Sequence, residues 1–167
     1  MLNSERDKLS IWFKTNKLSL NLKKTKFMVF QPRQKRSICN VQISVDNQNI
    51  VKVKEANFLG VILVKNLNWK SQISHVANKV AKSIGIISRC CFFLPKSSLR
   101  MLYYSLIYPY FYYCNIVWAS THKINLRRLV ILQKCIIRII NKSHFNAHTD
   151  HIFKDLCILK FTDIHLL

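Results

Sequence analysis

The stretch "ISHVANKVAKSIGIISRCC", residues 73–91, decides the fold. Its apolar positions follow one another at intervals of 3, 4, 4, 3 and 4 residues, which is the repeat of an α-helix that buries one face. These positions are Ile73, Val76, Val80, Ile84, Ile87 and Cys91. We therefore expect a long amphipathic helix here, inside a helical region that begins at Trp69.

The chain beyond this helix keeps the same period. Apolar seams recur over residues 99–107, 126–140 and 152–156. The tyrosine-rich stretch 101–121 has no charged residue, and its length alone is that of a membrane span. Tyrosine, however, prefers membrane interfaces to the bilayer centre, and Pro109 interrupts the stretch. We therefore expect a buried helix pair bent at Pro109, and no membrane span.

Toward the N-terminus the pattern changes. Residues 5–17 have the apolar face of a helix, for which Ser4 would be the N-cap. Alternating leucines and "TKFMVF" then indicate a strand, and "VQISV" and "IVKV" flank "DNQN" as the two arms of a hairpin. The segment "NFLGVILV", residues 57–64, is typical of one more buried strand with Gly60 inside it.

These patterns predict an α+β fold in two parts. Residues 1–68 would hold one helix and several short antiparallel strands, and residues 69–167 would form an all-helical bundle. Half of the chain is hydrophobic, so it can bury a sizeable core. The six cysteines include no C-x-x-C pair, and we expect buried reduced thiols in an intracellular protein rather than disulfides.

The charge of the chain is strongly one-sided. Lysine and arginine number 27 against 7 aspartates and glutamates, and the formal net charge of +20 favours a polyanionic partner, most simply nucleic acid. No acid lies between Asp7 and Asp46. The basic residues of this interval are Lys8, Lys14, Lys17, Lys23, Lys24, Lys26, Arg33, Lys35 and Arg36.

A second basic set lies on the first long helix. At helical spacing, Lys79, Lys82 and Arg89 fall nearly opposite the apolar seam. We expect this helix to bury one face and to offer the other to phosphates. A basic face that is merely solvated is the alternative.

The sequence contains no evident catalytic motif. Phosphoryl transfer by two metal ions needs converging carboxylates, and no two of the 7 acids are adjacent. His144, His148 and His151 have a helical spacing that could bring three imidazoles together. Thr149 and Asp150, however, look like the cap and the first residue of the last helix. We therefore assign no catalytic residue and no metal site.

Five segments, in the family's order, resemble the C-terminal part of reverse transcriptases from non-LTR retrotransposons, the jockey-like group of LINE elements. "LSIWFKTNKLSLNLKKTKFMVF", with its L-N-x-x-K-T core, is similar to the palm segment that follows the catalytic aspartates. "FLGVIL" followed by "LNW" is similar to the primer-grip strand and its exit. "LPKSSLRMLYYSLIYPYFYYCNIVW" and "LRRLVILQKCIIRII" resemble the thumb and the helices after it, and "HTDHIFKDLCILKFTDI" resembles the segment beyond.

The resemblance implies roles for particular residues. It places two sets in the family's palm motifs, Asn21, Lys24 and Thr25 after the catalytic centre and Phe58, Leu59 and Gly60 on the strand that supports the primer end. In polymerases a lysine at the position of Lys24 can assist the leaving pyrophosphate. The basic helix would be the thumb helix that tracks the duplex, so the expected nucleic-acid contacts are Lys23, Lys24, Lys26, Lys79, Lys82 and Arg89.

The resemblance also implies what the chain belongs to. Residues 1–68 would be a palm remnant and residues 69–167 the thumb and post-thumb region of an RNA-directed DNA polymerase. The aromatic-Ala-Asp-Asp hairpin of the family is expected shortly before Met1, so the chain alone would be inactive and need no cofactor, whereas the intact parent uses Mg²⁺. Its partners would be RNA, RNA–DNA hybrid or DNA, and the parent's N-terminal polymerase and endonuclease parts, inside the nucleus.

Two other functions remain open at this point. The chain could be a stand-alone basic helical nucleic-acid-binding protein derived from a transposon. It could also be a peripheral membrane protein that uses its tyrosine-rich segment. An in-frame aspartate pair upstream of Met1 would favour a truncated enzyme over the first alternative, and partition onto anionic vesicles tests the second.

Overall fold

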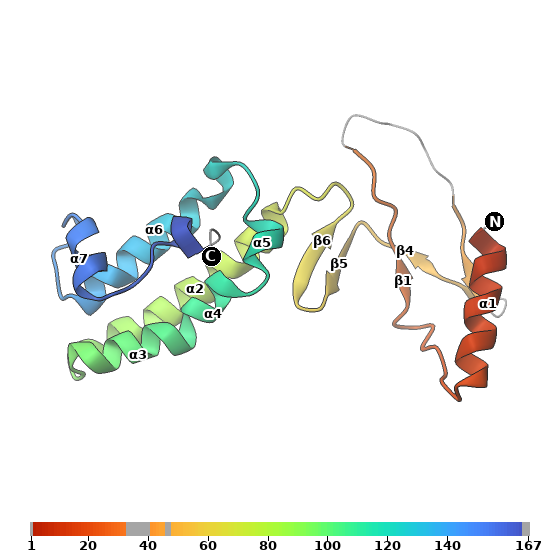
Figure 1. Ribbon diagram of the computed structural model, residues 1–167, viewed down its shortest axis with the longest axis horizontal. Helices are drawn as coiled ribbons and strands as arrows, with labels where there is room; N and C mark the ends of the chain where they lie inside the picture. Colours follow the sequence, from red (N-terminus) through yellow and green to blue (C-terminus); the bar gives the residue numbers. More distant parts are fainter. Residues whose placement is uncertain (1, 33–40, 46–47, 165–167) are drawn as a thin grey trace. The chain divides into compact units, whose positions relative to one another are not determined.

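The protein has a mixed α+β fold in which short strands precede a set of helices (Figure 1). The structure is a computed structural model that describes residues 2–32, 41–45 and 48–164. Its contacts divide the chain into an N-terminal unit, Met1–Leu67, and a C-terminal unit, Asn68–Leu167. Arg33, Lys35, Arg36 and Cys39, which figured in the sequence predictions, lie outside the described residues.

The N-terminal unit begins with a helix, α1, over Leu2–Thr15. Ser4 therefore lies inside this helix and is not its N-cap, contrary to the sequence prediction. Side chains close the other end of the helix, because the Thr15 hydroxyl donates to the Ile11 carbonyl at 2.9 Å and the Asn16 amide donates to the Trp12 carbonyl at 2.8 Å. Lys17, with a φ of 55°, then takes the left-handed conformation that commonly ends a helix.

The strands of this unit are short and pair two by two. They are β1 Lys26–Phe27, β2 Ser44–Val45, β3 Gln48–Asn49, β4 Val51–Lys52, β5 Glu55–Phe58 and β6 Val61–Val64. β2 pairs with β3 in antiparallel fashion, but β4 pairs with β1 in parallel. The expectation of antiparallel strands throughout is thus wrong. The expected hairpin is also wrong in its second arm, because Ser44–Val45 pairs with Gln48–Asn49 of the predicted turn "DNQN", whereas Val51–Lys52 of "IVKV" pairs with β1. Asp46 and Asn47 lie outside the described residues.

The segment predicted as one buried strand is a hairpin. β5 and β6 pair in antiparallel fashion with Phe58 opposite Val61, so Leu59 and Gly60 form the two-residue turn between them. Their φ angles of 47° and 79° are both positive, as in a type I′ turn. Gly60 therefore lies at the turn and not inside a strand, and Phe58 and Leu59 are exposed.

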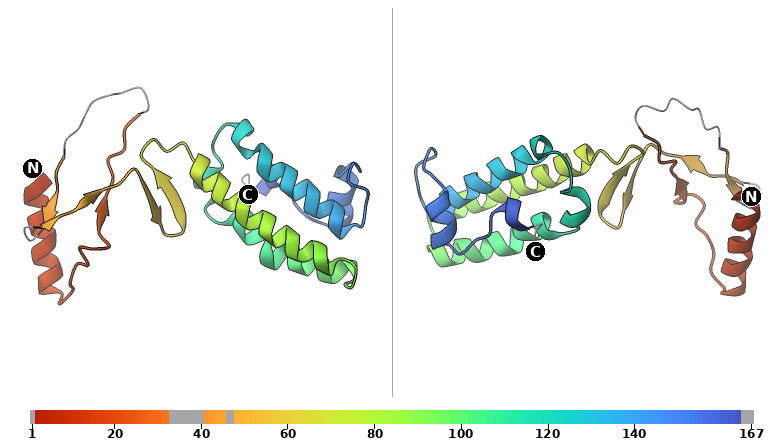
Figure 2. Two further views of the ribbon diagram at one scale, coloured as in Figure 1. Left: turned by 180° about the vertical axis from the view of Figure 1, so that it is seen from behind. Right: turned by 45° about the horizontal axis from the view of Figure 1, so that its top comes forward.

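The C-terminal unit consists of helices only, among its described residues. They are α2 Lys70–Cys90, α3 Lys96–Leu106, α4 Tyr108–Tyr112, α5 Asn115–Trp118, α6 Lys123–Ile140, α7 Asp150–Asp155 and α8 Phe161–Ile164. α2 lies alongside α3 and α6, as both views of Figure 2 show. α7 is not the last helix, because α8 follows it.

The predicted apolar seam of α2 is confirmed. Ile73, Val76, Val80, Ile84 and Ile87 are all buried, and Cys91 is half-buried at the end of the helix. The seam packs against α3 and α6. Ser83 adds a polar link, because its hydroxyl donates to the Leu106 carbonyl at 3.0 Å, at the end of α3 where no helical partner remains.

The tyrosine-rich segment is only partly buried. α3 ends at Leu106, and Pro109 lies in the first turn of α4, where its missing N–H is tolerated. The break is therefore at Ile107 and not at Pro109. Tyr103 and Phe111 are buried, whereas tyrosines on the opposite side are exposed, so the expected burial holds for one face of this helix pair only.

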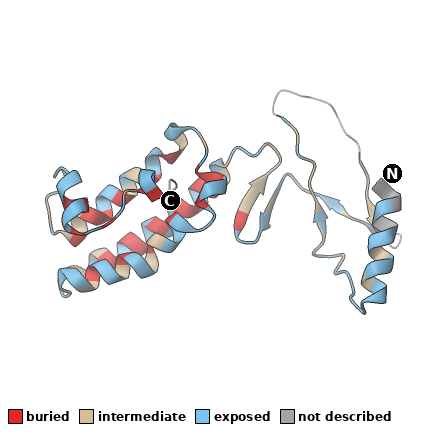
Figure 3. Ribbon diagram, viewed as in Figure 1, coloured by how far each residue is buried: buried red, intermediate tan, exposed pale blue. Residues whose placement is uncertain are grey.

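Aromatic rings close the core of this unit. Trp118 stacks on Phe161 with ring centroids 6.1 Å apart, and Phe111 meets the same ring at 5.2 Å. The Trp118 indole N–H donates to the Tyr113 carbonyl at 2.9 Å, so its polar end is satisfied. These contacts hold α8 against α4 and α5, and the buried residues gather in this unit (Figure 3).

A buried glutamine ties three segments together. The Gln133 amide nitrogen of α6 donates to the Tyr103 hydroxyl and to the Leu159 carbonyl, both at 2.9 Å. Its amide oxygen accepts a 2.7 Å hydrogen bond from the Phe161 N–H. Burial raises the pKa of the Tyr103 phenol well above its ordinary value, so this ring stays neutral. Gln133 thereby fixes the C-terminal segment on α3 and α6.

The cysteines differ from the sequence prediction. The described ones carry free thiols, as expected, but Cys114, Cys135 and Cys157 are exposed and Cys90 and Cys91 only half-buried. The expectation of buried thiols is therefore wrong. Cys135 lies on the outer side of α6, opposite the apolar seam of that helix.

Candidate nucleic-acid interface

The outer face of α2 carries the basic residues that the sequence placed there. Lys79, Lys82 and Arg89 are exposed, while the seam on the other side of the same helix is buried. Their side chains make no hydrogen bond or ion pair with any described residue. Because the helix is fixed by its core, these three cations are held on a rigid support and are available to a partner.

One further cation joins this face from another helix. The Arg128 guanidinium of α6 donates to the Asn78 side-chain oxygen of α2 at 3.0 Å. Asn78 directly precedes Lys79 and lies one turn before Lys82, so Arg128 is brought beside the basic face of α2. Sequence reasoning missed Arg128, because it lies 50 residues from its partner.

A second basic stripe runs along α6. Lys123, Arg127 and Lys134 are exposed and share one side of the helix. Lys134 and Lys160 both lower the pKa of Asp150, Lys160 more strongly through a 2.7 Å ion pair. Lys134 thus lies near a carboxylate, but that carboxylate is already paired with Lys160. Both α2 and α6 belong to a stretch without any acid, because no Asp or Glu lies between Glu55 and Asp150.

In the N-terminal unit, the lysines of the palm-like segment lie on a tight turn. The Asn21 carbonyl accepts hydrogen bonds from the Lys24 N–H at 3.0 Å, the Thr25 N–H at 2.9 Å and the Thr25 hydroxyl at 2.9 Å. The Asn21 side-chain oxygen also accepts from the Lys24 N–H at 3.2 Å. Asn21 and Thr25 therefore shape the turn, while the side chains of Lys23, Lys24 and Lys26 are exposed.

The second motif-matched group lies at the β5–β6 turn. Phe58, Leu59 and Gly60 form the tip of this hairpin, with Phe58 and Leu59 exposed. The six motif-matched residues thus belong to two separate turns of the N-terminal unit. The basic residues Lys79, Lys82 and Arg89 belong to the other unit.

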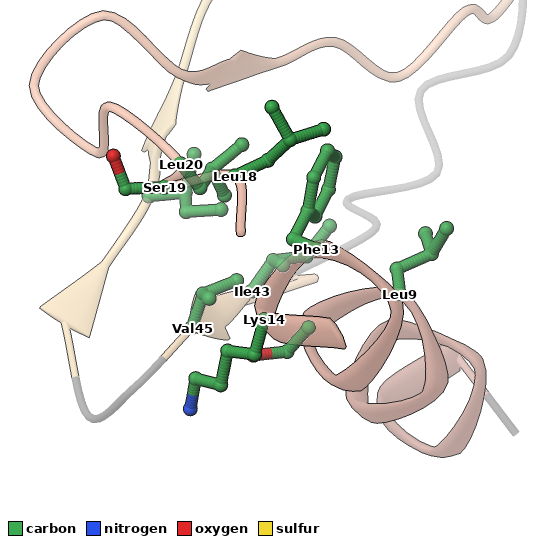
Figure 4. A pocket seen from close by; sticks show the side chains of 10 residues that line it. Leu9, Phe13, Lys14, Leu18, Ser19, Leu20, Ile43 and Val45 are labelled. Atoms are coloured by element: carbon green, nitrogen blue, oxygen red, sulfur yellow. The ribbon is translucent and has the colours of Figure 1, made fainter. Parts of the chain in front are cut away.

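The N-terminal unit also contains an apolar pocket of about 410 Å³ (Figure 4). Its walls come from α1, from the leucines that follow α1, and from the segment around β2. The lining residues are Leu9, Ser10, Phe13, Lys14, Leu18, Ser19, Leu20, Ile43, Val45 and Ile50. The alternating leucines that the sequence predicts to be strand-like thus border an open pocket instead of a closed core.

Acidic and histidine side chains do not form a metal site within the described residues. No group of three or more His, Cys, Asp or Glu side chains there could hold a metal ion. Thr149 is buried as the residue before α7, although its side chain makes no capping hydrogen bond. His144 and His148 lie in the loop before α7 and His151 within it, so the three do not share a helix.

Comparison of the chain with protein-family models, with curated proteins and with solved structures finds no match. Across the part of the chain that is described, none of the helices has the length and apolar character needed to cross a membrane.

Proposed function

We propose that this chain binds a nucleic-acid duplex through its phosphates, as the palm-edge and thumb part of a reverse transcriptase of a non-LTR retrotransposon. The observation that carries the proposal is the basic face of α2, in which Lys79, Lys82 and Arg89 project from a helix whose opposite side is buried. RNA, RNA–DNA hybrid and DNA all present the phosphates that such a face would contact. Phosphate contacts fix position and carry no base information.

The spacing of these cations suits a phosphate backbone. Lys79 and Arg89 are separated by ten residues, which is roughly 15 Å along a helix. One strand of a duplex advances about 3.4 Å per nucleotide along its axis, so this distance corresponds to roughly four nucleotides. The absence of acids from the surrounding sequence leaves the attraction unopposed.

The lysines at the Asn21–Thr25 turn supply a second proposed contact. Lys23, Lys24 and Lys26 are exposed and belong to a turn that Asn21 and Thr25 hold by hydrogen bonds. In an intact polymerase of this family, Lys24 would lie after the catalytic aspartates, where Mg²⁺ and the triphosphate bind. For the present chain we propose only a phosphate contact for these lysines, and we assign no catalytic residue.

The salt dependence of duplex binding tests the proposal. Each phosphate contact contributes roughly 0.9 to the slope of log affinity against log salt concentration for duplex DNA. The triple variant Lys79→Gln/Lys82→Gln/Arg89→Gln should therefore flatten this slope by about two to three units, by a similar amount on unrelated sequences. Circular dichroism should show an unchanged fold, because all three side chains are exposed.

The stripe on α6 offers a matched control. The variant Lys123→Gln/Arg127→Gln/Lys134→Gln removes the same charge from exposed positions of the same unit. We expect it to flatten the slope by less than about one unit, because the proposal places the phosphate contacts on α2 and none on this stripe. Equal effects of the two variants would mean that net charge alone drives binding. The folded α2 variant could instead keep the wild-type slope, while a variant changed at Lys23, Lys24 and Lys26 has a flatter slope. That result would show that the basic face of α2 does not contact the phosphates.

A further inference from the structure

The turn between α2 and α3 exposes two adjacent aromatic rings. Phe92 and Phe93 have 83% and 86% of their surface exposed. They follow directly on the end of α2, in the green turn of Figure 1. Their neighbours Cys91 and Leu94 point the other way and pack on the core. The turn therefore packs two half-buried apolar side chains on the core and presents the other two to solvent.

This turn is short and internally hydrogen-bonded. The Phe93 and Leu94 N–H groups both donate to the Cys90 carbonyl at 3.1 Å, and the Cys91 thiol donates to the Ser88 carbonyl at 3.0 Å. Pro95 follows with an extended backbone, and the Leu99 N–H donates back to its carbonyl at 3.1 Å. Packing and hydrogen bonds thus account for the turn without any contribution from the two phenylalanine rings.

Cations flank the two rings on both helices. Arg89 lies in the last turn of α2, and Lys96 is the first residue of α3; both are exposed. A lysine in the first turn of a helix opposes the helix dipole, so helix stability does not explain Lys96. The tip of the α2–α3 hairpin therefore combines exposed aromatic surface with positive charge at the end of the basic face of α2.

We propose that Phe92 and Phe93 form a stacking platform for unpaired bases of a nucleic acid, with Arg89 and Lys96 on the adjoining phosphates. This inference rests on the proposed function, and it adds single-stranded segments to the ligands of the C-terminal unit. Aromatic rings beside a cationic track are the means by which proteins hold single strands without reading their sequence. Binding flat on a membrane would require a continuous apolar helix face, but on the outer side of α3 the exposed Met101 lies between the exposed polar residues Ser97 and Ser105.

The test uses the full chain with two probes, a single-stranded DNA that contains 2-aminopurine and a blunt duplex of the same sequence. Binding of the wild type should change the fluorescence of 2-aminopurine, because stacking on a ring alters it. The variant Phe92→Ser/Phe93→Ser should lose about tenfold or more in affinity for the single strand, and less than about twofold for the duplex. Phe145→Ser is the matched control, because Phe145 is 72% exposed elsewhere in the unit, and it should leave both affinities unchanged.

The outcomes separate this inference from the proposed function. If the wild type binds neither probe, both proposals fail. If the duplex binds with the salt dependence expected from α2 but the Phe92/Phe93 variant keeps its single-strand affinity, only the stacking platform is overturned. It is also overturned if the Phe92/Phe93 variant loses single-strand and duplex affinity equally. The same holds if that variant loses binding to phosphatidylserine vesicles, or self-association, while its single-strand affinity is unchanged.

Discussion

The two units of this protein differ in how many apolar side chains their helices and strands bury. In the N-terminal unit, Val45 and Val61 are the only described apolar side chains that are buried, and the strands are two to four residues long. In the C-terminal unit, a continuous core runs from Ile73 to Ile164. Figure 3 shows the contrast as buried segments in one unit and exposed ones in the other.

The difference follows from where backbone hydrogen bonds are made. A helix satisfies its interior N–H and C=O groups locally and needs neighbours only for its apolar face. A strand leaves one edge unpaired unless another strand covers it, and an isolated two-stranded sheet is marginal in water. Among the described residues, the three separate strand pairs of the N-terminal unit thus leave edges for further pairing. This accords with the proposal that the unit is the margin of a larger palm.

The largest expected effect contrasts one tryptophan from each unit. Trp118 is fully buried against Phe161, whereas Trp12 on α1 is 54% exposed. Trp118→Ala should lower the free energy of unfolding by about 3–5 kcal/mol, and Trp12→Ala by less than about 0.5 kcal/mol. Chemical denaturation, monitored by the circular dichroism of the helices, measures both changes in the free energy of unfolding. A comparable loss from Trp12→Ala would mean that the N-terminal unit is better packed than its exposed side chains indicate.

An intermediate effect is expected from the polar contact inside the C-terminal core. Gln133→Leu would leave the Phe161 N–H and the Leu159 carbonyl without their partner, at a cost of about 1–3 kcal/mol in unfolding free energy. Tyr103→Phe removes one hydrogen bond of the same group. The double variant should therefore cost less than the sum of the single ones in a denaturation series. Strict additivity would show that the glutamine does not couple α3 to the C-terminal segment.

Sequence reasoning succeeded where a single period ran long enough. The seam of α2 and that of α6 were predicted from spacing alone, and their residues are buried except Cys91 and Val130, which are half-buried. The predictions of strand pairing failed because the pairing depends on distant partners, as in the parallel pairing of Lys26 with Val51. The prediction of a single strand over "NFLGVILV" failed for a local reason, since Leu-Gly is a much weaker turn signal than Asn-Gly.

The residues of the candidate site were likewise predictable from the sequence only in part. The exposure of Lys79, Lys82 and Arg89 follows from the same helical period as the seam. Arg128 could not be predicted, because its place beside Asn78 depends on the packing of α6 on α2. Phe92 and Phe93 occur in an apolar run, where hydrophobicity alone suggests burial. The direction of each side chain is set by a turn whose geometry the sequence does not reveal.

The smallest expected effect concerns the β5–β6 hairpin, whose strands are the longest among the described residues of the N-terminal unit. Leu59 has a φ of 47°, a conformation that costs most L-residues about 1 kcal/mol and that asparagine tolerates better. Leu59→Asn should therefore stabilise the β5–β6 hairpin by less than about 1 kcal/mol. Gly60→Ala, at a φ of 79°, should destabilise it by a similar amount.

Amide hydrogen exchange of β6, compared with that of α6 in the same sample, measures both changes. We expect slower exchange over Val61–Val64 in the asparagine variant and faster exchange in the alanine variant, with α6 unaffected in both. Opposite signs at adjacent positions would establish that the turn limits this hairpin. If β6 already exchanges as slowly as α6 in the wild type, the hairpin is as stable as the helical core, and the contrast between the two units does not extend to this part of the N-terminal unit.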